Sequence, residues 1–472
     1  MTSTFLHGFA TASYQVEGSV DVDGRGSSVW DDLCNREGAI VDGSSGSEAT
    51  DTYHRYKEDV ALIKELGANS HRFSLSWSRI IPLGGADDPV NPLGVQFYNN
   101  FIDELIANGI EPMVTLFHWD LPLALQKRYG GWLDKEQATR DFVNYARVCF
   151  SHFGDRVKLW ITLNEPFCTS ILGHSLGVHA PGRSSDRTKS PEGDSATEPW
   201  IVGHSLLVAH ASAVDLYRRE EGEIGISLNG DWCEPWDDSE ENIAAAQRAQ
   251  EFWVSWFADP IYLTGDYPSC MREQLGDRLP TFSKEEKKLV LGSSDFYGMN
   301  HYTSNLIKNK SGPAAADDYQ GNVEYTTVGP NGNPPALGYQ SQCGWLQTAP
   351  WGFRKLLVWI YKRYGVPIIV TENGMPVRGE GDLPIEQALN DGPRVDFFKG
   401  YLENLELAMK EDGVAVRGYI AWSLLDNFEW AEGYIPRFGV VYVDYTTQKR
   451  TPKRSAHFIK QWFEEKQEKE QQ

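Results

Sequence analysis

Residues 367–374 read Pro-Ile-Ile-Val-Thr-Glu-Asn-Gly, an apolar run that closes on a glutamate. A short apolar run of this kind predicts a buried β-strand, so Glu372 should lie where the strand ends and a loop begins. Residues 159–166 read Leu-Trp-Ile-Thr-Leu-Asn-Glu-Pro and place Glu165 in the equivalent position. Carboxylates at the ends of parallel strands are expected at the mouth of an α/β barrel, where catalytic groups collect.

Apolar runs of the same kind recur along the whole chain and alternate with amphipathic helical stretches. The helical stretches carry apolar residues at i, i+3, i+4 and i+7. Eight strands that alternate with helices predict an α/β fold, with a parallel sheet closed into a (β/α)8 TIM barrel. No Gly-x-Gly-x-x-Gly turn follows the first strand, which disfavours an open dinucleotide-binding sheet. The predicted strands are Phe5–Ala12, His71–Trp77, Pro112–His118, Leu159–Asn164, Ile224–Asn229, Phe296–Tyr302, Pro367–Thr371 and Gly418–Leu424.

Three long stretches rich in Gly, Pro, Ser and Asp each come after a predicted strand. Loops of this length are uncommon in compact domains unless they are functional or disordered. We expect them to rise from the catalytic face of the barrel and to form the wall of a funnel. Because nothing marks a domain boundary, residues 1–472 are predicted to form a single barrel domain. The three stretches are Pro181–Thr197, Lys308–Gly338 and Arg378–Gly392.

The chain is strongly acidic, with a net charge of −22 from 44 Lys and Arg against 66 Asp and Glu. Nucleic acids and anionic membranes attract clustered cations, so partners of both kinds are disfavoured, as is a polyanionic substrate. A neutral sugar is compatible with this charge. The 16 Trp residues also suit a sugar, because the apolar face of a pyranose stacks on an aromatic ring, although most of them are expected in the core.

The six cysteines form no Cys-x-x-Cys pair, so we expect reduced thiols and no metal or redox motif. The N-terminal residues show no charged region followed by an apolar one, and no apolar run approaches the ~20 residues of a membrane span. We therefore expect a cytoplasmic enzyme without a signal peptide. It should need no cofactor, no metal and no obligatory protein partner.

Two carboxylates that face each other are what glycosidic bond cleavage needs. One protonates the leaving oxygen, and the other attacks the anomeric carbon. Further distinctive phrases accompany the two glutamates in a fixed order along the chain. They are residues 9–18 (Phe-Ala-Thr-Ala-Ser-Tyr-Gln-Val-Glu-Gly), 72–74 (Arg-Phe-Ser), 118–122 (His-Trp-Asp-Leu-Pro), 300–302 (Asn-His-Tyr) and 422–430 (Trp-Ser-Leu-Leu-Asp-Asn-Phe-Glu-Trp).

With this set of phrases the chain resembles glycoside hydrolase family 1, the retaining β-glycosidases, from about Phe5 to Trp462. Its general character is similar to that of the intracellular fungal β-glucosidases. The resemblance implies that Glu165 is the general acid/base and that Glu372 is the nucleophile of a covalent glycosyl-enzyme. In a retaining enzyme the two carboxyl groups should lie about 5–5.5 Å apart. Glu165 should be neutral and Glu372 ionised in the resting enzyme.

The resemblance also implies a set of supporting and substrate-binding residues. Arg72 and Tyr302 match positions that contact the nucleophile, and Asn300 is expected to support Tyr302 and the nucleophile. Asn164 should address the 2-hydroxyl of the sugar, and Glu429 should accept from its 4- and 6-hydroxyls. The other sugar contacts are expected from Gln15, His118, Trp119 and Trp430, with Trp422 as the stacking floor. The aglycone is expected against Phe167, Leu172 and Trp345.

Two comparisons within that family narrow the expected substrate. Glu432 stands where phospho-β-glycosidases carry a pattern for a 6-phosphate, so an unphosphorylated sugar is expected. Thioglucosidases of the family replace the acid with Gln, whereas Glu165 is intact, so ordinary O-glycosides are expected. We expect a β-glucosidase that removes terminal non-reducing β-D-glucosyl residues from cellobiose, short cello-oligosaccharides and aryl β-glucosides, with transglycosylation.

Other functions remain open at the level of sequence. A β-galactosidase or β-fucosidase of the same family is compatible with the motifs, because Glu429 suits either orientation of the 4-hydroxyl. A catalytically silent sugar-binding relative would usually have lost one of the two glutamates. A metal-dependent hydrolase or an aldolase on the same barrel would need clustered ligands or a Schiff-base lysine. His118, Asp120 and His179 make no ligand spacing, which disfavours that alternative.

Overall fold

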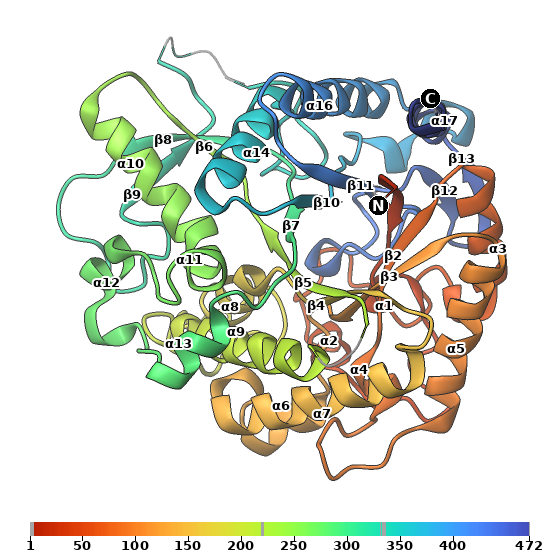
Figure 1. The fold of residues 1–472 in the computed structure, drawn as a ribbon, viewed down its shortest axis with the longest axis horizontal. Helices are drawn as coiled ribbons and strands as arrows, with labels where there is room; N and C mark the ends of the chain where they lie inside the picture. Colours follow the sequence, from red (N-terminus) through yellow and green to blue (C-terminus); the bar gives the residue numbers. More distant parts are fainter. Residues whose placement is uncertain (1–3, 219–220, 331, 333–336, 472) are drawn as a thin grey trace.

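Eight parallel strands close into a barrel in the order β1-β11-β10-β7-β5-β4-β3-β2 (Figure 1). The computed structural model describes residues 4–218, 221–330, 332 and 337–471. Each barrel strand falls within or overlaps one of the predicted runs, so the predicted (β/α)8 fold is confirmed. The barrel strands are β1 (Leu6–Ala10), β2 (Ser70–Ser74), β3 (Glu111–Phe117), β4 (Leu159–Asn164), β5 (Glu223–Asn229), β7 (Tyr297–Asn300), β10 (Ile368–Glu372) and β11 (Val416–Trp422).

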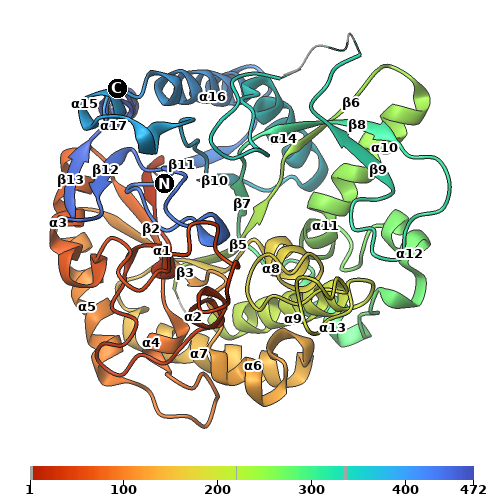
Figure 2. The ribbon, with the colours of Figure 1, turned by 180° about the vertical axis from the view of Figure 1, so that it is seen from behind.

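Helices surround the barrel, as Figures 1 and 2 show from opposite sides. Strands β2, β4, β7 and β10 are buried at every residue, because helices cover them outside and side chains fill the barrel inside. The α-helices are α1 (Ser13–Val16), α2 (Val29–Cys34), α3 (Thr52–Glu65), α4 (Trp77–Ile80), α5 (Pro92–Ala107), α6 (Leu123–Tyr129), α7 (Lys135–Phe153), α8 (Pro166–His174), α9 (Glu198–Tyr217), α10 (Glu240–Gln250), α11 (Trp256–Tyr262), α12 (Ser269–Leu275), α13 (Lys284–Val290), α14 (Pro350–Tyr364), α15 (Ile385–Ala388), α16 (Gly392–Lys410) and α17 (Arg454–Gln471). Shorter turns are η1 (Gly131–Leu133), the π-helix η2 (Glu251–Ser255), η3 (Gly276–Arg278), η4 (Glu380–Asp382) and η5 (Trp430–Glu432).

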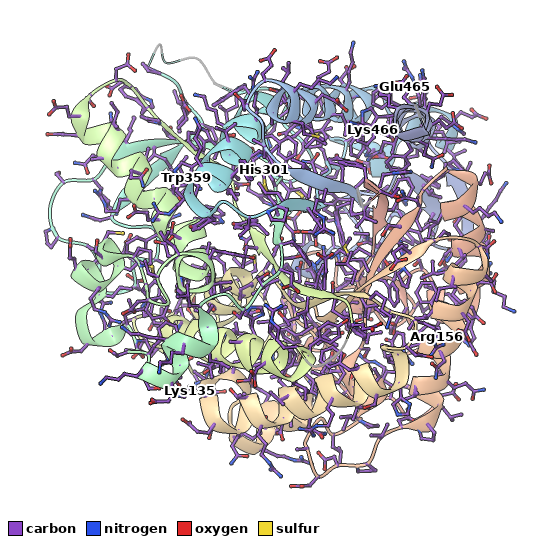
Figure 3. All side chains as sticks on the ribbon, in the orientation of Figure 1. Lys135, Arg156, His301, Trp359, Glu465 and Lys466 are labelled. Carbon is purple, nitrogen blue, oxygen red and sulfur yellow. The ribbon has the colours of Figure 1, made fainter. Side chains whose placement is uncertain are left out.

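Local sequence explains how the surrounding helices form. Helix α7, for example, begins after Asp134, whose side chain accepts a hydrogen bond from the Gln137 amide and so satisfies one free N–H of the first turn. Its buried face includes Phe142, Tyr145 and Cys149, spaced by three and four residues, and this face packs inward. Figure 3 shows where buried and more exposed side chains lie in the molecule: fully buried His301 lies within the outline, and Lys135 and Glu465 lie near the rim.

Two small sheets were not predicted. Strands β6 (Trp232–Pro235), β8 (Ser304–Asn309) and β9 (Val323–Thr326) form one beside α10, and β12 (Val441–Asp444) pairs with β13 (Lys449–Pro452) in the other. The stretch 308–338, predicted as a long loop, therefore contains the end of β8 and all of β9, and its residues 331 and 333–336 lie outside the described part. The stretch 378–392 contains η4 and α15, whereas 181–197 has no helix or strand.

A buried network of ion pairs lies beneath the segments that follow β10 and β11. Arg394 pairs with Glu380 and, at 2.5 Å, with Asp391, while Lys453 pairs with Glu380 at 2.5 Å and with Asp426 at 2.8 Å. Burial opposes ionisation of Glu380, but the charges of Arg394 and Lys453 hold its pKa below the usual range. The network thus joins the segment after β10, the start of α16 and the segment after β11 to the residue before α17. Of the helices in the described part, none combines the length and apolar character that a membrane crossing requires.

Candidate active site

A cavity of about 530 Å³ opens among the segments that follow the barrel strands. Such segments at the carboxyl ends of strands form the active sites of (β/α)8 barrels. Most of the predicted site residues line this cavity, and Gln15, Arg72 and Asn164 are buried without lining it. The predicted residues that line it are His118, Trp119, Glu165, Phe167, Leu172, Asn300, Tyr302, Trp345, Glu372, Trp422, Glu429 and Trp430.

Glu372 is the last residue of β10 and lies beside Asn300 in the sheet register. Arg72 on β2 donates from Nη1 to Glu372 Oε1 at 2.5 Å. The Tyr302 hydroxyl donates to Glu372 Oε2 at 2.6 Å. A cation and a phenol therefore hold the two oxygens of Glu372, which fixes the direction of the carboxylate and favours its charged form.

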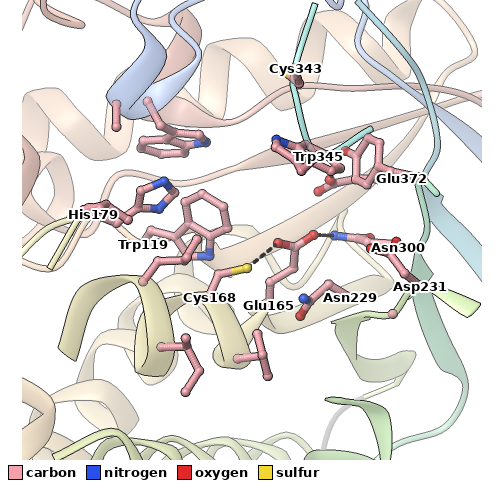
Figure 4. A pocket seen from close by; sticks show the side chains of 18 of the residues that line it. Trp119, Glu165, Cys168, His179, Asn229, Asp231, Asn300, Cys343, Trp345 and Glu372 are labelled. Atoms are coloured by element: carbon pink, nitrogen blue, oxygen red, sulfur yellow. Dashed lines mark hydrogen bonds between the residues drawn. The ribbon is translucent and has the colours of Figure 1, made fainter. Parts of the chain in front are cut away.

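Glu165 follows β4 directly and begins helix α8, with Pro166 at the first helical position. Its backbone has φ 45° and ψ 67°, in the left-handed region that non-glycine residues adopt at a cost. Its Oε1 accepts from Asn300 Nδ2 at 2.7 Å, and its Oε2 accepts from the Cys168 thiol at 3.1 Å (Figure 4). Glu165 thus has neutral hydrogen-bond donors where Glu372 has a cation.

The two carboxyl groups differ in how their surroundings shift their pKa values. Burial and the negative charge of Glu372 raise the pKa of Glu165 to about 8. Burial also raises the pKa of Glu372, but the charge of Arg72 and the hydrogen bond from Tyr302 act in the opposite direction. Of the pair, Glu165 is therefore the group that keeps its proton at neutral pH, as an acid must.

Asn300 acts on both glutamates: the predicted support of Glu372 is joined by a direct contact with Glu165. Its amide donates to Glu165 Oε1 and, at 2.9 Å, to Asn164 Oδ1, while its Oδ1 accepts from Thr371 at 2.6 Å. The hydrogen bonds of its side chain thus reach the acid rather than Tyr302, although the Asn300 amide also lowers the pKa of Glu372. Asn300 ends β7, which neighbours β10 with Glu372 on one side and is separated by β5 alone from β4, the strand that Glu165 follows.

Asn164 is held from several sides at the end of β4. Arg72 Nη2 donates to its Oδ1 at 2.6 Å, and its Nδ2 lies 3.1 Å from His118 Nε2. Burial and the charge of Arg72 lower the pKa of His118 well below its ordinary value, so the imidazole is neutral. The Trp119 indole donates to the backbone oxygen of Asn164 at 3.0 Å. The side chain next to the acid is therefore preorganised rather than free to rotate.

Two predicted sugar ligands carry buried polar atoms without a partner among the described residues. These atoms are Gln15 Oε1 and His118 Nδ1. The Gln15 amide nitrogen is already bound, to Asn427 at 3.0 Å and to the backbone oxygen of Phe428 at 2.8 Å. A buried polar atom without a partner is costly, so a hydroxyl-bearing ligand that satisfies both atoms is expected here.

Aromatic side chains and Glu429 complete the cavity wall around His118. The His118 ring stacks on Trp422 and on Trp430, with centroids 5.9 Å apart in both pairs. Trp119 and Trp430 have φ values of 75° and 51°, so both adopt backbone conformations that are unusual away from functional sites. Burial and the charge of Glu432 raise the pKa of Glu429 well above its ordinary value. Glu429 thus offers polar oxygens to a neutral ligand.

The three predicted aglycone residues all line the cavity. Phe167 is buried and stacks on Trp253, with centroids 5.2 Å apart and planes at 3°. Trp345 is half exposed and stands edge-on to Tyr302 at 5.7 Å. Leu172 of α8 lines the same cavity. These side chains give this part of the cavity wall an apolar, aromatic character.

Several lining residues were missed by sequence reasoning. Asn229 ends β5, so the rule that catalytic groups collect at strand ends could have found it. Asp231 and Cys168 follow barrel strands by two and four residues and carry no distinctive motif. Trp253 lies in the π-helix η2, a local irregularity that frequently occurs at functional sites but that no sequence pattern predicts. Other missed residues are Ile171, Val178, His179, Asn305, Tyr319, Cys343 and Phe438.

The site can perform acid and nucleophilic chemistry with its own side chains. It holds one ionisable carboxyl beside a cation and another that retains a proton, which is the pairing that glycoside hydrolysis requires. Across the described residues, no group of three or more His, Cys, Asp and Glu side chains is arranged to hold a metal ion. The six cysteines are free thiols.

Comparisons with known proteins show similarity to β-glucosidases over nearly the whole chain. Beta-glucosidase 1B of Phanerodontia chrysosporium is 59% identical over 468 residues, which cover 98% of this chain and 85% of that protein. A crystal structure of a family 1 β-glucosidase from Humicola insolens in complex with glucose has 57% identity and a TM-score of 0.96, covering 98% of this chain and 99% of that one. A rice β-glucosidase mutant in a covalent complex with Glc has 43% identity and a TM-score of 0.93, with 97% of each chain covered. The model of Glycosyl hydrolase family 1 matches residues 1–468. The chain belongs to glycosyl hydrolase family 1.

Proposed function

We propose that the protein is a retaining β-glucosidase that removes terminal non-reducing β-D-glucosyl residues by double displacement. The observation that carries this proposal is the difference between the two carboxyl groups. Glu372 is held by Arg72 and Tyr302, as a nucleophile requires, and Glu165 is protonated by its surroundings, as a general acid requires.

The first displacement forms a covalent glycosyl-enzyme. A Glu372 oxygen attacks the anomeric carbon from the α face, and the bond from that carbon to the glycosidic oxygen breaks. Glu165 transfers its proton to the departing oxygen, so the aglycone leaves as a neutral alcohol or phenol. Arg72 and Tyr302 hold Glu372 in the direction of attack until the new bond replaces its charge.

The second displacement releases the sugar with its configuration retained. Glu165, now ionised, accepts a proton from water, and the water oxygen attacks the anomeric carbon from the β face. The ester bond to Glu372 breaks, and the carboxylate regains its hydrogen bonds with Arg72 and Tyr302. The product is β-glucose, and Glu165 is again protonated. The covalent Glc complex of the rice relative supports this two-step course.

Three features support glucose as the sugar. The β-glucosidases of Phanerodontia chrysosporium and Humicola insolens align over nearly the whole chain, and the latter holds glucose. Gln15 and His118 offer unpartnered polar atoms for hydroxyls. The described residues that line the cavity include Glu429 and Glu432 but no lysine or arginine to bind a phosphate group, which disfavours a phosphorylated sugar. We propose cellobiose, short cello-oligosaccharides and aryl β-glucosides as substrates.

The experiment that tests the proposal follows hydrolysis of p-nitrophenyl β-glucoside by proton NMR. We expect β-glucose to form first and to equilibrate slowly with the α-anomer. The corresponding β-galactoside and β-fucoside should have lower kcat/KM values. Initial α-glucose would contradict retention, and faster turnover of the galactoside or fucoside would assign one of those activities instead.

The pH dependence of kcat/KM should have its basic limb at about pH 8. Glu165 must be protonated to donate, so activity falls as the pH rises through its pKa of about 8. Glu372 must be ionised to attack, and because its pKa is raised, the acid limb should lie above the ordinary glutamate value of 4.5. Initial rates with p-nitrophenyl β-glucoside across this range measure both limbs, which belong to the coupled pair. Activity that stays constant well above pH 9 would exclude Glu165 as the acid.

Transglycosylation should accompany hydrolysis at high substrate concentration. The apolar part of the cavity wall that contains Phe167, Leu172 and Trp345 favours a sugar acceptor over water for reaction with the glycosyl-enzyme. Chromatography of cellobiose reactions should show trisaccharides whose share of the products rises with cellobiose concentration. Trp345→Ala should lower this share more than it lowers total glucose release. Glucose as the sole product at every concentration would contradict the prediction.

A further inference from the structure

Cys168 lies in α8 three residues after Glu165, on the same face of the helix and within the cavity wall. Its Sγ is 3.1 Å from Glu165 Oε2, and Figure 4 shows the thiol and the Asn300 amide on the two oxygens of the carboxyl group. The double-displacement mechanism proposed above assigns no role to this thiol. Its contact with the acid nevertheless makes it more than a packing residue.

The two oxygens of Glu165 cannot be equivalent. Oε1 faces the Asn300 Nδ2 group, which only donates hydrogen bonds, so Oε1 must act as an acceptor. The carbonyl oxygen of a neutral carboxyl group is the stronger acceptor, so we place the proton of the neutral acid on Oε2. This is the oxygen beside Cys168, and it is the oxygen from which the proton leaves for the glycosidic bond.

A thiol suits both states of this oxygen. Sulfur accepts a weak hydrogen bond from Oε2–H when Glu165 is protonated, and S–H donates to Oε2 when Glu165 is ionised. Burial and the charge of Glu165 raise the pKa of Cys168 well above its ordinary value, so the thiol keeps its proton through the working range. An alkyl group could serve neither state.

We propose that Cys168 is a positioning residue for the general acid, which holds Oε2 in place while the proton of Glu165 leaves and returns. The proposal rests on the proposed acid role of Glu165. The hydrogen bond from the Cys168 thiol also lowers the pKa of Glu165, whereas burial raises it. Loss of the thiol should therefore misdirect the acid and strengthen its hold on the proton.

The variants Cys168→Val and Cys168→Ser separate positioning from packing. Valine fills the space without a hydrogen bond, and serine keeps a group that both donates and accepts. The matched control is Cys270→Val, because the Cys270 thiol contacts Glu251 Oε2 at a similar distance of 3.0 Å, away from the cavity. All variants are assayed with aryl and alkyl β-glucosides whose leaving groups range from 2,4-dinitrophenol, which needs no proton, to alcohols, which do.

We expect Cys168→Val to lower kcat/KM about tenfold more for alkyl glucosides than for the dinitrophenyl glucoside, the scale of one hydrogen bond to a charged group. The basic limb of the pH profile of kcat/KM for Cys168→Val should move to higher pH. Cys168→Ser should restore both properties, and Cys270→Val should change neither. Equal losses across all leaving groups, or a serine variant that behaves like valine, would overturn the proposal.

The acid role itself is tested separately with Glu165→Gln. If the loss of kcat/KM depends strongly on the leaving group in Glu165→Gln but not in Cys168→Val, the positioning role of the thiol is rejected and Glu165 remains the general acid. Absence of the dependence in Glu165→Gln would reject the acid assignment, and the thiol proposal with it. Circular dichroism and melting temperatures of the variants show whether the fold is intact.

Discussion

Replacement of Glu372 by glycine should lower turnover of p-nitrophenyl β-glucoside by roughly 10⁴- to 10⁶-fold, the range found when a catalytic nucleophile is removed. The loss is large because Arg72 and Tyr302 would remain aimed at a carboxylate that is absent. Azide should enter the space left on the α face and attack the anomeric carbon there. The product should be α-glucosyl azide, and its formation should restore release of p-nitrophenol.

The measurement combines release of p-nitrophenol, with and without azide, and NMR identification of the product. Glu372→Gln is the matched control, because its amide fills the space and leaves azide no room. It should be as inactive as the glycine variant and should not be rescued. An active Glu372→Gly enzyme, or β-glucosyl azide as its product, would remove Glu372 from the role of nucleophile.

Replacement of Glu165 by glycine should lower kcat/KM for cellobiose by roughly 10²- to 10⁴-fold, the usual contribution of a general acid. The effect should be much smaller for 2,4-dinitrophenyl β-glucoside, whose leaving group departs without protonation. The glycosyl-enzyme should then accumulate, because no base activates water. Azide should attack from the β face, which Glu165 no longer occupies, and give β-glucosyl azide.

The two variants thus predict azides of opposite configuration, and each serves as a control for the other. Glycine also suits position 165, where the backbone φ is 45°, so the loss of activity should not come from misfolding. Kinetics with both substrates and NMR of the azide products measure the outcome. Equal losses with cellobiose and the dinitrophenyl glucoside would contradict an acid role.

The barrel was predictable because its strands are short apolar runs that alternate with amphipathic helices. Strand β10 begins with the apolar run Ile368, Ile369 and Val370 because both faces of the strand are buried. Strand β9 was missed for the opposite reason. Its residues 323–326 read Val-Glu-Tyr-Thr, and three of the four are partly or wholly exposed, so no apolar run marks it within a polar loop. It forms a strand because β8 offers it hydrogen-bonding partners.

Part of the site was predictable as residues, but several lining residues and the contacts between side chains were not. Motifs at strand ends identified both glutamates, and the structure adds which side chain holds which oxygen. Asn300 shows the difference: its position follows from the end of β7, but its preference for Glu165 depends on side-chain geometry that no residue pattern encodes. Cys168 was missed because a cysteine beside a conspicuous motif carries no signal until its distance to Glu165 is known.

The buried ion pairs beneath the β11 segment imply an uneven rigidity around the cavity. Lys453 and Arg437 both bind Asp426, three residues before Glu429, with almost no solvent exposure. Amide hydrogens of this segment should exchange with deuterium only when the whole domain opens, whereas those around half-exposed Trp345 should exchange through small local openings. The side of the cavity formed by the segment after β11 would then be rigid and would bind one sugar selectively. The side around Trp345 would be more flexible and would accept different leaving groups. Substitutions there could change the preferred leaving group during evolution without changing how the sugar is recognised.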